Sequence, residues 1–272
     1  MRIVSYEAEG VVRAGIVEDG TVVDAGASVR ALLEAGELDT LAARIDPGVG
    51  RPLDEIELLP PVPDPDKIVC IGLNYRAHAA EAGIDPPESP TFFGKFRNAL
   101  AAPGAAVPMP AASDKLDFEA EVAFVIGSRA SVVSEDEALD HVAGYMLFND
   151  LSARDLQFAT PQWMPGKIFD GSAPCGPALV TPDDAGPHDA IEFSLTLNGE
   201  EMQAASTDDL IFPVPSLVAR LSALMTLEPG DIVATGTPSG VGSTRDPRVW
   251  LAPGDEIVID SPTLGRLETR IG

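Results

Sequence analysis

The stretch from Leu116 to Ile126 constrains this chain most, because it places two carboxylates inside an otherwise apolar run. Glu119 and Glu121 are two residues apart, so in a β-strand they would share one face, with backbones roughly 7 Å apart. That face continues with Ala123 and Val125, and the opposite face is apolar as well. A strand that is apolar on both sides is typical of burial on both sides.

Two buried carboxylates side by side repel each other, and burying them unpaired is costly. A divalent cation removes that cost, and a hard cation suits carboxylate oxygens. A third carboxylate, Asp150, ends the apolar run 144–150. The sequence therefore predicts a metal site formed by Glu119, Glu121 and Asp150. The alternative is an ordinary Glu-x-Glu pair on the solvent face of a half-buried strand.

The charge of the chain limits its partners. The 272 residues include 18 basic and 43 acidic ones, giving a net charge of −25. This balance argues against nucleic acid and anionic membranes as partners, and an anionic substrate must be held by a metal or a few basic groups. There is no signal-peptide segment or membrane-length run, which predicts a cytoplasmic protein. Cys70 and Cys175, the only cysteines, are expected to be reduced core residues.

Two domains are expected, 1–64 and 65–272. In the first, strands are predicted over 2–6, 11–17 and 21–23, a helix from Ser28 to Ala35, and a strand over 55–59. The proline-rich stretch 60–65 would be a stiff linker. In the second, strands outnumber helices, so the class is α+β and β-rich, with short peripheral helices. Strand 191–197 with its Asn-Gly turn and helix 213–224 are the clearest elements there.

Further polar groups lie at the ends of predicted elements. A helix starting at Asn74 and ending at Gly83 would place His78 and Glu81 on one face. A helical turn over 152–158 would do the same for Arg154 and Gln157. Lys167 lies among aromatic residues, and the glycine-rich loop 234–242 could hold a carboxylate through its amides. The simpler alternatives are surface positions on helices and an ordinary turn.

Taken together, these segments resemble the fumarylacetoacetate hydrolase family. The matching stretches occur in the family's order across roughly 66–272. They are KIVCIGLNYRAH (67–78), LDFEAEV (116–122), FNDLSARDLQ (148–157), QWMPGKIFD (162–170) and TGTPSGVG (235–242). The resemblance implies a mixed β-sandwich or roll core, a homodimer, and a site for Mg²⁺, Mn²⁺ or Ca²⁺.

The resemblance also implies roles for individual residues. Glu119, Glu121 and Asp150 fall on the family's metal ligands. His78 and Glu81 fall on its catalytic pair, carried on a segment that acts as a lid in relatives, and Lys167 falls on its active-site lysine. Arg154, Gln157 and Thr237 fall on substrate-contacting positions, and Tyr75 is expected in the same substrate-binding set.

The first expected function is metal-dependent hydrolysis of a C–C bond in a 2,4-diketo acid of the acylpyruvate or fumarylpyruvate type. Such a site would stabilise an enolate with its metal, and His78, oriented by Glu81, would activate water. The alternatives at the same site are isomerisation of a 2-hydroxyhepta-2,4-diene-1,7-dioate, tautomerisation, or decarboxylation of oxaloacetate. A metal-binding protein without activity is the third possibility, which the full set of polar positions argues against.

Overall fold

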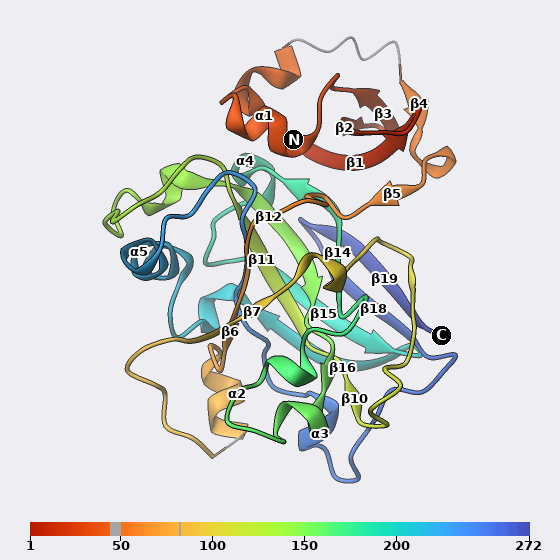
Figure 1. The fold of residues 1–272 in the computed structure, drawn as a ribbon, viewed down its shortest axis with the longest axis vertical. Coiled ribbons are helices and arrows are strands. Elements are labelled where there is room, and N and C mark those ends of the chain that lie inside the picture. Colours follow the sequence, from red (N-terminus) through yellow and green to blue (C-terminus); the bar gives the residue numbers. More distant parts are fainter. Residues whose placement is uncertain (44–49, 82) are drawn as a thin grey trace.

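β-Strands dominate the chain, as its apolar patterns predict (Figure 1). The computed structural model describes residues 1–43, 50–81 and 83–272. Within these ranges, one sheet has twelve strands, a second has five, and β10 (Leu116–Asp117) pairs with β13 (Ser152–Ala153). The large sheet runs in the order β4 (Arg51–Pro52), β3 (Thr21–Asp24), β2 (Val11–Glu18), β1 (Arg2–Ala8), β14 (Ala173–Val180), β12 (Val142–Asn149), β11 (Ala120–Ile126), β17 (Ile232–Ala234), β6 (Ile68–Gly72) and β7 (Thr91–Lys95), with β5 (Leu58–Leu59) beside β1 and β8 (Leu100–Ala101) beside β14.

The five-stranded sheet packs across the large one, and few helices accompany the two. Its order is β16 (Glu200–Ser206), β15 (Glu192–Leu197), β18 (Glu256–Ser261), β19 (Gly265–Ile271) and β9 (Ala106–Val107). Within the described residues, the α-helices are α1 (Val29–Glu34), α2 (Arg76–Glu81), α3 (Arg154–Gln157), α4 (Pro182–Ala185) and α5 (Val214–Leu224), and short 3-10 helices occur between other elements. The expected β-rich α+β class with short peripheral helices is confirmed. No helix in the described ranges has the length and apolar character needed to cross a membrane.

β11 is buried on both faces because it separates two hydrophobic cores. Every residue of the strand is buried. Val122 and Phe124 belong to the core that reaches the five-stranded sheet, whereas Ala123 and Val125 belong to a second core that includes Ile3. Burial on both sides explains the doubly apolar pattern of this stretch. The glutamates lie on the second face, where that core gives way to a cavity.

The register between β11 and β12 brings the third carboxylate beside the first. Ala120 pairs with Asn149, so the next residues outward are Glu119 and Asp150, and the Asp150 amide donates to the Glu119 carbonyl at 2.9 Å. The strand expected from Leu116 is interrupted at this point. Asn149 Oδ1 accepts a hydrogen bond from the Glu119 amide at 3.1 Å, and Gln203 Oε1 accepts one from the Ala120 amide at 3.0 Å. Side-chain oxygens therefore take the place of backbone carbonyls as acceptors for these two amides.

The N-terminal strands form a layer at one end of the molecule, opposite α2 and α3 (Figure 1). β1 joins β14 through two residue pairs, Arg2 with Val180 and Ile3 with Leu179. Ser28 caps α1, as predicted, by accepting from the Ala31 amide at 3.2 Å. The strand expected over 55–59 is limited to Leu58–Leu59. The domain boundary after residue 64 stays a prediction.

Asn74 does not cap α2, contrary to the sequence-based expectation. Its side chain is fully buried and bridges distant segments: Nδ2 donates to the carbonyls of Phe212 and Thr235, and Oδ1 accepts from the Phe212 amide. The first turn of α2 is capped from outside instead, because Asp209 accepts from the Ala77 amide at 2.9 Å. Asn74 therefore fixes the base of the helix and leaves its far end free to approach the cavity.

Candidate metal centre and active site

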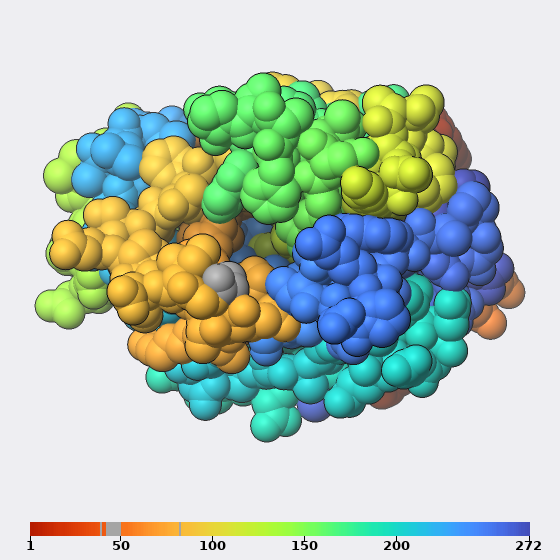
Figure 2. Space-filling model, turned by 90° about the horizontal axis from the view of Figure 1, so that it is seen from below, coloured from red at the N-terminus to blue at the C-terminus, as the bar shows by residue number. Residues whose placement is uncertain are grey.

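A cavity of about 220 Å³ opens at the end of the molecule that carries α2 and α3. Figure 2 shows this end, with a hollow between the segments coloured orange, green and blue. The described residues that line the cavity come from five segments, none of them N-terminal to residue 71: Ile71, Gly72, Leu73, His78, Ile84, Phe93, Glu119, Glu121, Asp150, Arg154, Gln157, Phe158, Trp163, Lys167, Thr237, Val241, Ser243 and Thr244.

The three carboxylates predicted as metal ligands meet in this cavity. Glu119, Glu121 and Asp150 each offer one oxygen, and these oxygens all lie within 4.8 Å of one another. All three residues are buried, with at most 6% of their surface exposed. The spacing of Glu119 and Glu121 along the strand and the position of Asp150 at the end of its neighbour produce this convergence, as expected.

Glu119 and Asp150 have cationic partners. Lys167 Nζ lies 2.7 Å from both Glu119 Oε2 and Asp150 Oδ2. Arg154 Nη1 lies 2.7 Å from Glu119 Oε1, and Lys95 Nζ lies 2.6 Å from Asp150 Oδ1. Burial alone would raise the pKa of Glu119, but the charges of Lys167 and Arg154 outweigh it and lower that pKa to about 2. Lys167 stays protonated, because these carboxylates raise its pKa despite its burial.

Glu121 is the exception in the triad. Its described contact is a hydrogen bond from the Gly236 amide to Oε2 at 2.8 Å. Burial, followed by the charges of Asp150 and Glu119, raises the pKa of Glu121 well above its usual range. The site therefore lacks positive charge beside this carboxylate. Three convergent, buried carboxylates that lack one compensating charge fit a hard divalent cation.

His78 and Glu81 form a pair at the cavity wall. Their spacing on α2 brings His78 Nδ1 to 3.0 Å from Glu81 Oε2. Glu81 Oε1 accepts from the Gly240 amide at 3.0 Å, so the pair is tied to the glycine-rich loop. A carboxylate acceptor at Nδ1 favours the tautomer whose Nε2 is basic. His78 lines the cavity, so this second nitrogen is the one available to a bound molecule.

The predicted substrate-binding residues differ in their placement. Arg154 and Gln157 line the cavity and contact each other, with Nη1 to Oε1 at 3.0 Å. Thr237 also lines it, although its hydroxyl donates to the Ala120 carbonyl at 2.9 Å. Tyr75 does not line the cavity. Its ring is fully buried and packs edge-on against Phe193, 6.2 Å between centroids, so the expected substrate contact is corrected to a role in the core.

Three buried polar residues of the site carried no role in the sequence-based prediction. Lys95 binds Asp150 and the Ser172 carbonyl, Asp117 binds Arg154, and Gln203 donates to Thr237. Lys95 had a detectable signal, since it is one of only four lysines in the chain and stands in an apolar strand. Gln203 had none, because it lies in a short strand, Glu200–Ser206, whose polar and apolar residues do not alternate.

Three buried carboxylates that converge at a cavity are consistent with a divalent metal site, and comparison with known proteins identifies the family. Residues 67–272 match the family described as Fumarylacetoacetate (FAA) hydrolase C-terminal, so the chain belongs to the fumarylacetoacetate hydrolase family. It is 41% identical over 223 residues to "Oxaloacetate tautomerase FAHD2A, mitochondrial" of Bos taurus, covering 81% of this chain and 71% of that protein.

Two solved structures are similar over nearly their whole length. The fumarylacetoacetate hydrolase from psychrophilic Exiguobacterium antarcticum superposes with a TM-score of 0.88 at 32% identity, covering 100% of this chain and 99% of that one. The 2-hydroxyhepta-2,4-diene-1,7-dioate isomerase from Mycobacterium marinum gives 0.82 at 30% identity, covering 100% and 98%. The chain is thus an enzyme of a family that acts on keto acids, and its relatives include tautomerases, isomerases and hydrolases.

Proposed function

We propose that this enzyme interconverts the keto and enol forms of a short 2-oxo dicarboxylic acid of the oxaloacetate type, with a divalent metal held by Glu119, Glu121 and Asp150. The observation that carries the proposal is the clustering of Lys167 and Arg154 around that triad at the cavity wall. The sequence similarity to an oxaloacetate tautomerase supports it. Mg²⁺, Mn²⁺ and Ca²⁺ are the candidate ions, since all three prefer oxygen ligands.

The chain's own residues suit proton transfer next to a carbonyl. His78 Nε2 accepts the proton from C3, while Glu81 holds the ring and stabilises the imidazolium that forms. Lys167, held as a cation beside Glu119, stabilises the negative charge that grows on the C2 oxygen. When bound, the divalent cation supplies Lewis-acid stabilisation to that same oxygen. The imidazolium of His78 then gives this proton to the C2 oxygen, which completes the enol, and in the reverse direction His78 takes the proton from that oxygen and returns it to C3.

The distribution of charge in the cavity favours a short substrate. Arg154 and Lys167 both contact the triad, so the fixed positive charge is concentrated at the metal end. Other parts of the wall are apolar and include Leu73, Ile84 and Trp163. A carboxylate placed against such a wall would be desolvated without a partner, which is costly. An acid whose two carboxylates flank the keto group avoids that cost.

Hydrolysis of a 2,4-diketo acid is the second candidate, and the His78–Glu81 pair is the observation that favours it. A histidine with a basic Nε2 at the cavity wall could equally deprotonate a water that attacks a distal carbonyl. The similarity to a fumarylacetoacetate hydrolase supports this alternative.

One assay separates the two candidates. The purified enzyme, stripped with EDTA and reloaded with Mg²⁺, is mixed with freshly dissolved oxaloacetate enol, and the loss of enol absorbance is followed against the uncatalysed rate. The same preparation is given acylpyruvates, with products identified by NMR. Metal-dependent acceleration of enol loss without C–C cleavage is expected. Cleavage of acylpyruvates with no effect on oxaloacetate would replace tautomerisation by hydrolysis.

A further inference from the structure

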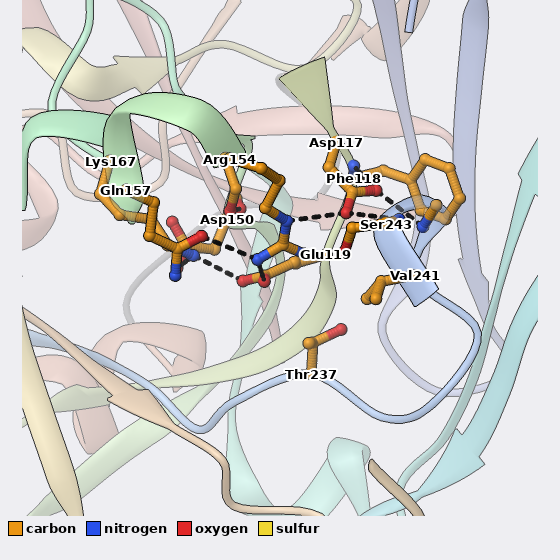
Figure 3. Close-up of polar contacts among 12 residues, drawn as sticks. Asp117, Phe118, Glu119, Asp150, Arg154, Gln157, Lys167, Thr237, Val241 and Ser243 are labelled. Carbon is orange, nitrogen blue, oxygen red and sulfur yellow. Dashed lines mark hydrogen bonds and ion pairs between the residues drawn. The ribbon is translucent and has the colours of Figure 1, made fainter. Parts of the chain in front are cut away.

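Asp117 lies directly behind the cavity and accepts four hydrogen bonds. It is fully buried on β10 and is not among the residues that line the cavity. Oδ1 accepts from the amides of Phe118 at 2.9 Å and Gly242 at 2.7 Å. Oδ2 accepts from the Ser243 amide at 3.0 Å and from Arg154 Nε at 2.7 Å. Figure 3 shows this carboxylate between the arginine and the loop at Ser243.

The contacts of Arg154 leave one end of its guanidinium for a ligand. Nε is held by Asp117, and Nη1 is held by Glu119 and Gln157. Nη2 is buried and has no hydrogen-bond partner among the described residues. A buried donor without a partner is costly, and in a cavity wall it marks the place of an acceptor. Arg154 lines the cavity, and its guanidinium there keeps one N–H group without a partner among the described residues.

The same carboxylate also fixes the neighbouring part of the wall, because Oδ2 binds both Arg154 Nε and the Ser243 amide. Val241, Ser243 and the next residue line the cavity. Gly242 allows the loop to approach Asp117, because a Cβ there would lie 2.8 Å from Asp117 Oδ1 and 2.1 Å from the Val249 carbonyl. Two successive amides bound to one buried carboxylate hold this turn in place.

We propose that Asp117 is a positioning residue that sets substrate affinity by locking Arg154 and the 241–244 loop in one arrangement. The substrate group it serves is a carboxylate, received by the guanidinium of Arg154 at the cavity wall. The inference rests on the proposed function only in taking the substrate to be a carboxylic acid. Without Asp117, the guanidinium of Arg154 is held only by Glu119 and Gln157 and can change its orientation. Substrate affinity should therefore fall more than the rate of the chemical step.

The test uses the Mg²⁺-loaded enzyme with oxalate as probe, an anion that offers two carboxylates. Asp117→Asn keeps the shape of the side chain but removes its charge. Calorimetry should show oxalate binding weakened by about 10–100-fold, the usual effect of removing a residue that orients a ligand-binding group. KM for oxaloacetate should rise by a similar factor with a smaller change in kcat.

Asp231→Asn is the matched control. Asp231 is equally buried, accepts from the amides of Lys67 and Glu228 and pairs with Lys67 Nζ at 2.7 Å, but it does not line the cavity. It should lower the melting temperature and leave oxalate affinity unchanged. Mg²⁺ affinity is measured separately, without oxalate, for every variant.

A double-mutant cycle with Arg154→Gln shows whether Asp117 acts through the arginine. If it does, Asp117→Asn weakens oxalate little further once Arg154 is gone. Additive losses in the cycle, or unchanged oxalate affinity in Asp117→Asn, would overturn the proposal. If Asp117→Asn fails to fold, Asp117→Glu, which keeps the charge, takes its place in the cycle. Its loss of oxalate affinity should be non-additive with that of Arg154→Gln in the same way. Failure of oxaloacetate turnover by the wild type would count against the proposed function and leave this cycle interpretable.

Discussion

Replacing Glu121 by glutamine should stabilise the metal-free enzyme, whereas the same change at Glu119 should destabilise it. The two residues are two positions apart and both are buried. Glu119 has Lys167 and Arg154 within 2.7 Å, but Glu121 has only a backbone amide among its described contacts. Glutamine preserves the acceptor for that amide and removes the unpaired charge. At Glu119 it leaves two buried cations short of a partner.

The expected size of each effect follows from these contacts. At pH 7, keeping a glutamate protonated whose pKa in the unfolded chain is near 4.3 costs about 3.7 kcal/mol, which is the upper limit of the gain at Glu121. A gain of about 2 kcal/mol would raise the melting temperature by roughly 4–8 °C for a domain of this size. Breaking the buried ion pairs of Glu119 should cost about 3–5 kcal/mol.

The pH dependence of folding stability gives an independent test of the direction of each effect. The pKa of Glu121 is raised in the folded state, so its protonated form stabilises the metal-free fold at low pH, and that contribution is lost as the pH rises above the unfolded value. The advantage of Glu121→Gln should therefore grow with pH from about 4.3 upward. Glu119 has a lowered pKa of about 2, so its contribution is present above the unfolded pKa and lost as the pH falls toward 2.

Thermal unfolding with EDTA and with excess Mg²⁺ measures these effects. Wild type should gain about 2.7 kcal/mol at a Mg²⁺ concentration 100 times its Kd, and Glu121→Gln should gain far less. The ranking of the two proteins then reverses on adding metal. Glu201→Gln, an exposed change of equal charge, is the control and should show neither effect. A metal-free Glu121→Gln protein less stable than wild type at pH 7 would refute the reasoning.

Two further predictions concern catalysis. His78→Ala should lower kcat for tautomerisation by about 10²–10⁴-fold while calorimetry shows unchanged Mg²⁺ affinity, because His78 serves as a base and not as a ligand; a wild-type rate in this variant would remove it from proton transfer. The net charge of −25 should repel a dianionic substrate, so kcat/KM should rise, roughly tenfold, as ionic strength increases from about 0.01 to 0.15 M, with the Debye length falling from about 30 to 8 Å. A decrease over that range would show that local positive charge at the cavity mouth outweighs the overall charge.

Local sequence patterns predicted the elements that carry the triad. Glu119 and Glu121 share a face because strands have a period of two, and Asp150 follows the partner strand. The helical spacing of His78 and Glu81 predicted their contact in the same way. These residues could be found because each depends on neighbours within four positions or on the end of an apolar run.

The residues that sequence reasoning misplaced depend on contacts across the fold. Asn74 resembles a helix cap locally, but its partners Phe212 and Thr235 lie more than 130 positions away along the chain. Tyr75 stands within a catalytic motif, yet its direction is set by Phe193 on another sheet. Such pairings have no periodic signal. The homodimer also stays a prediction, because an interface between two copies cannot be described from a single chain.

The balance of charge at the site suggests why binding should be ordered. Asp117, Glu119, Glu121 and Asp150 are four buried carboxylates, and Lys95, Lys167 and Arg154 are three buried cations among them. With Glu121 ionised, this set carries one excess negative charge. Without a metal, the raised pKa of Glu121 favours its protonated form, so the empty site is neutral and has no net attraction for an anion. A divalent cation changes the excess to one positive charge, which an anionic substrate can then offset. The lysines and the arginine thus offset most of the cost of burying the carboxylates in the metal-free enzyme. The metal then gives the site the net positive charge that binds an anionic keto acid.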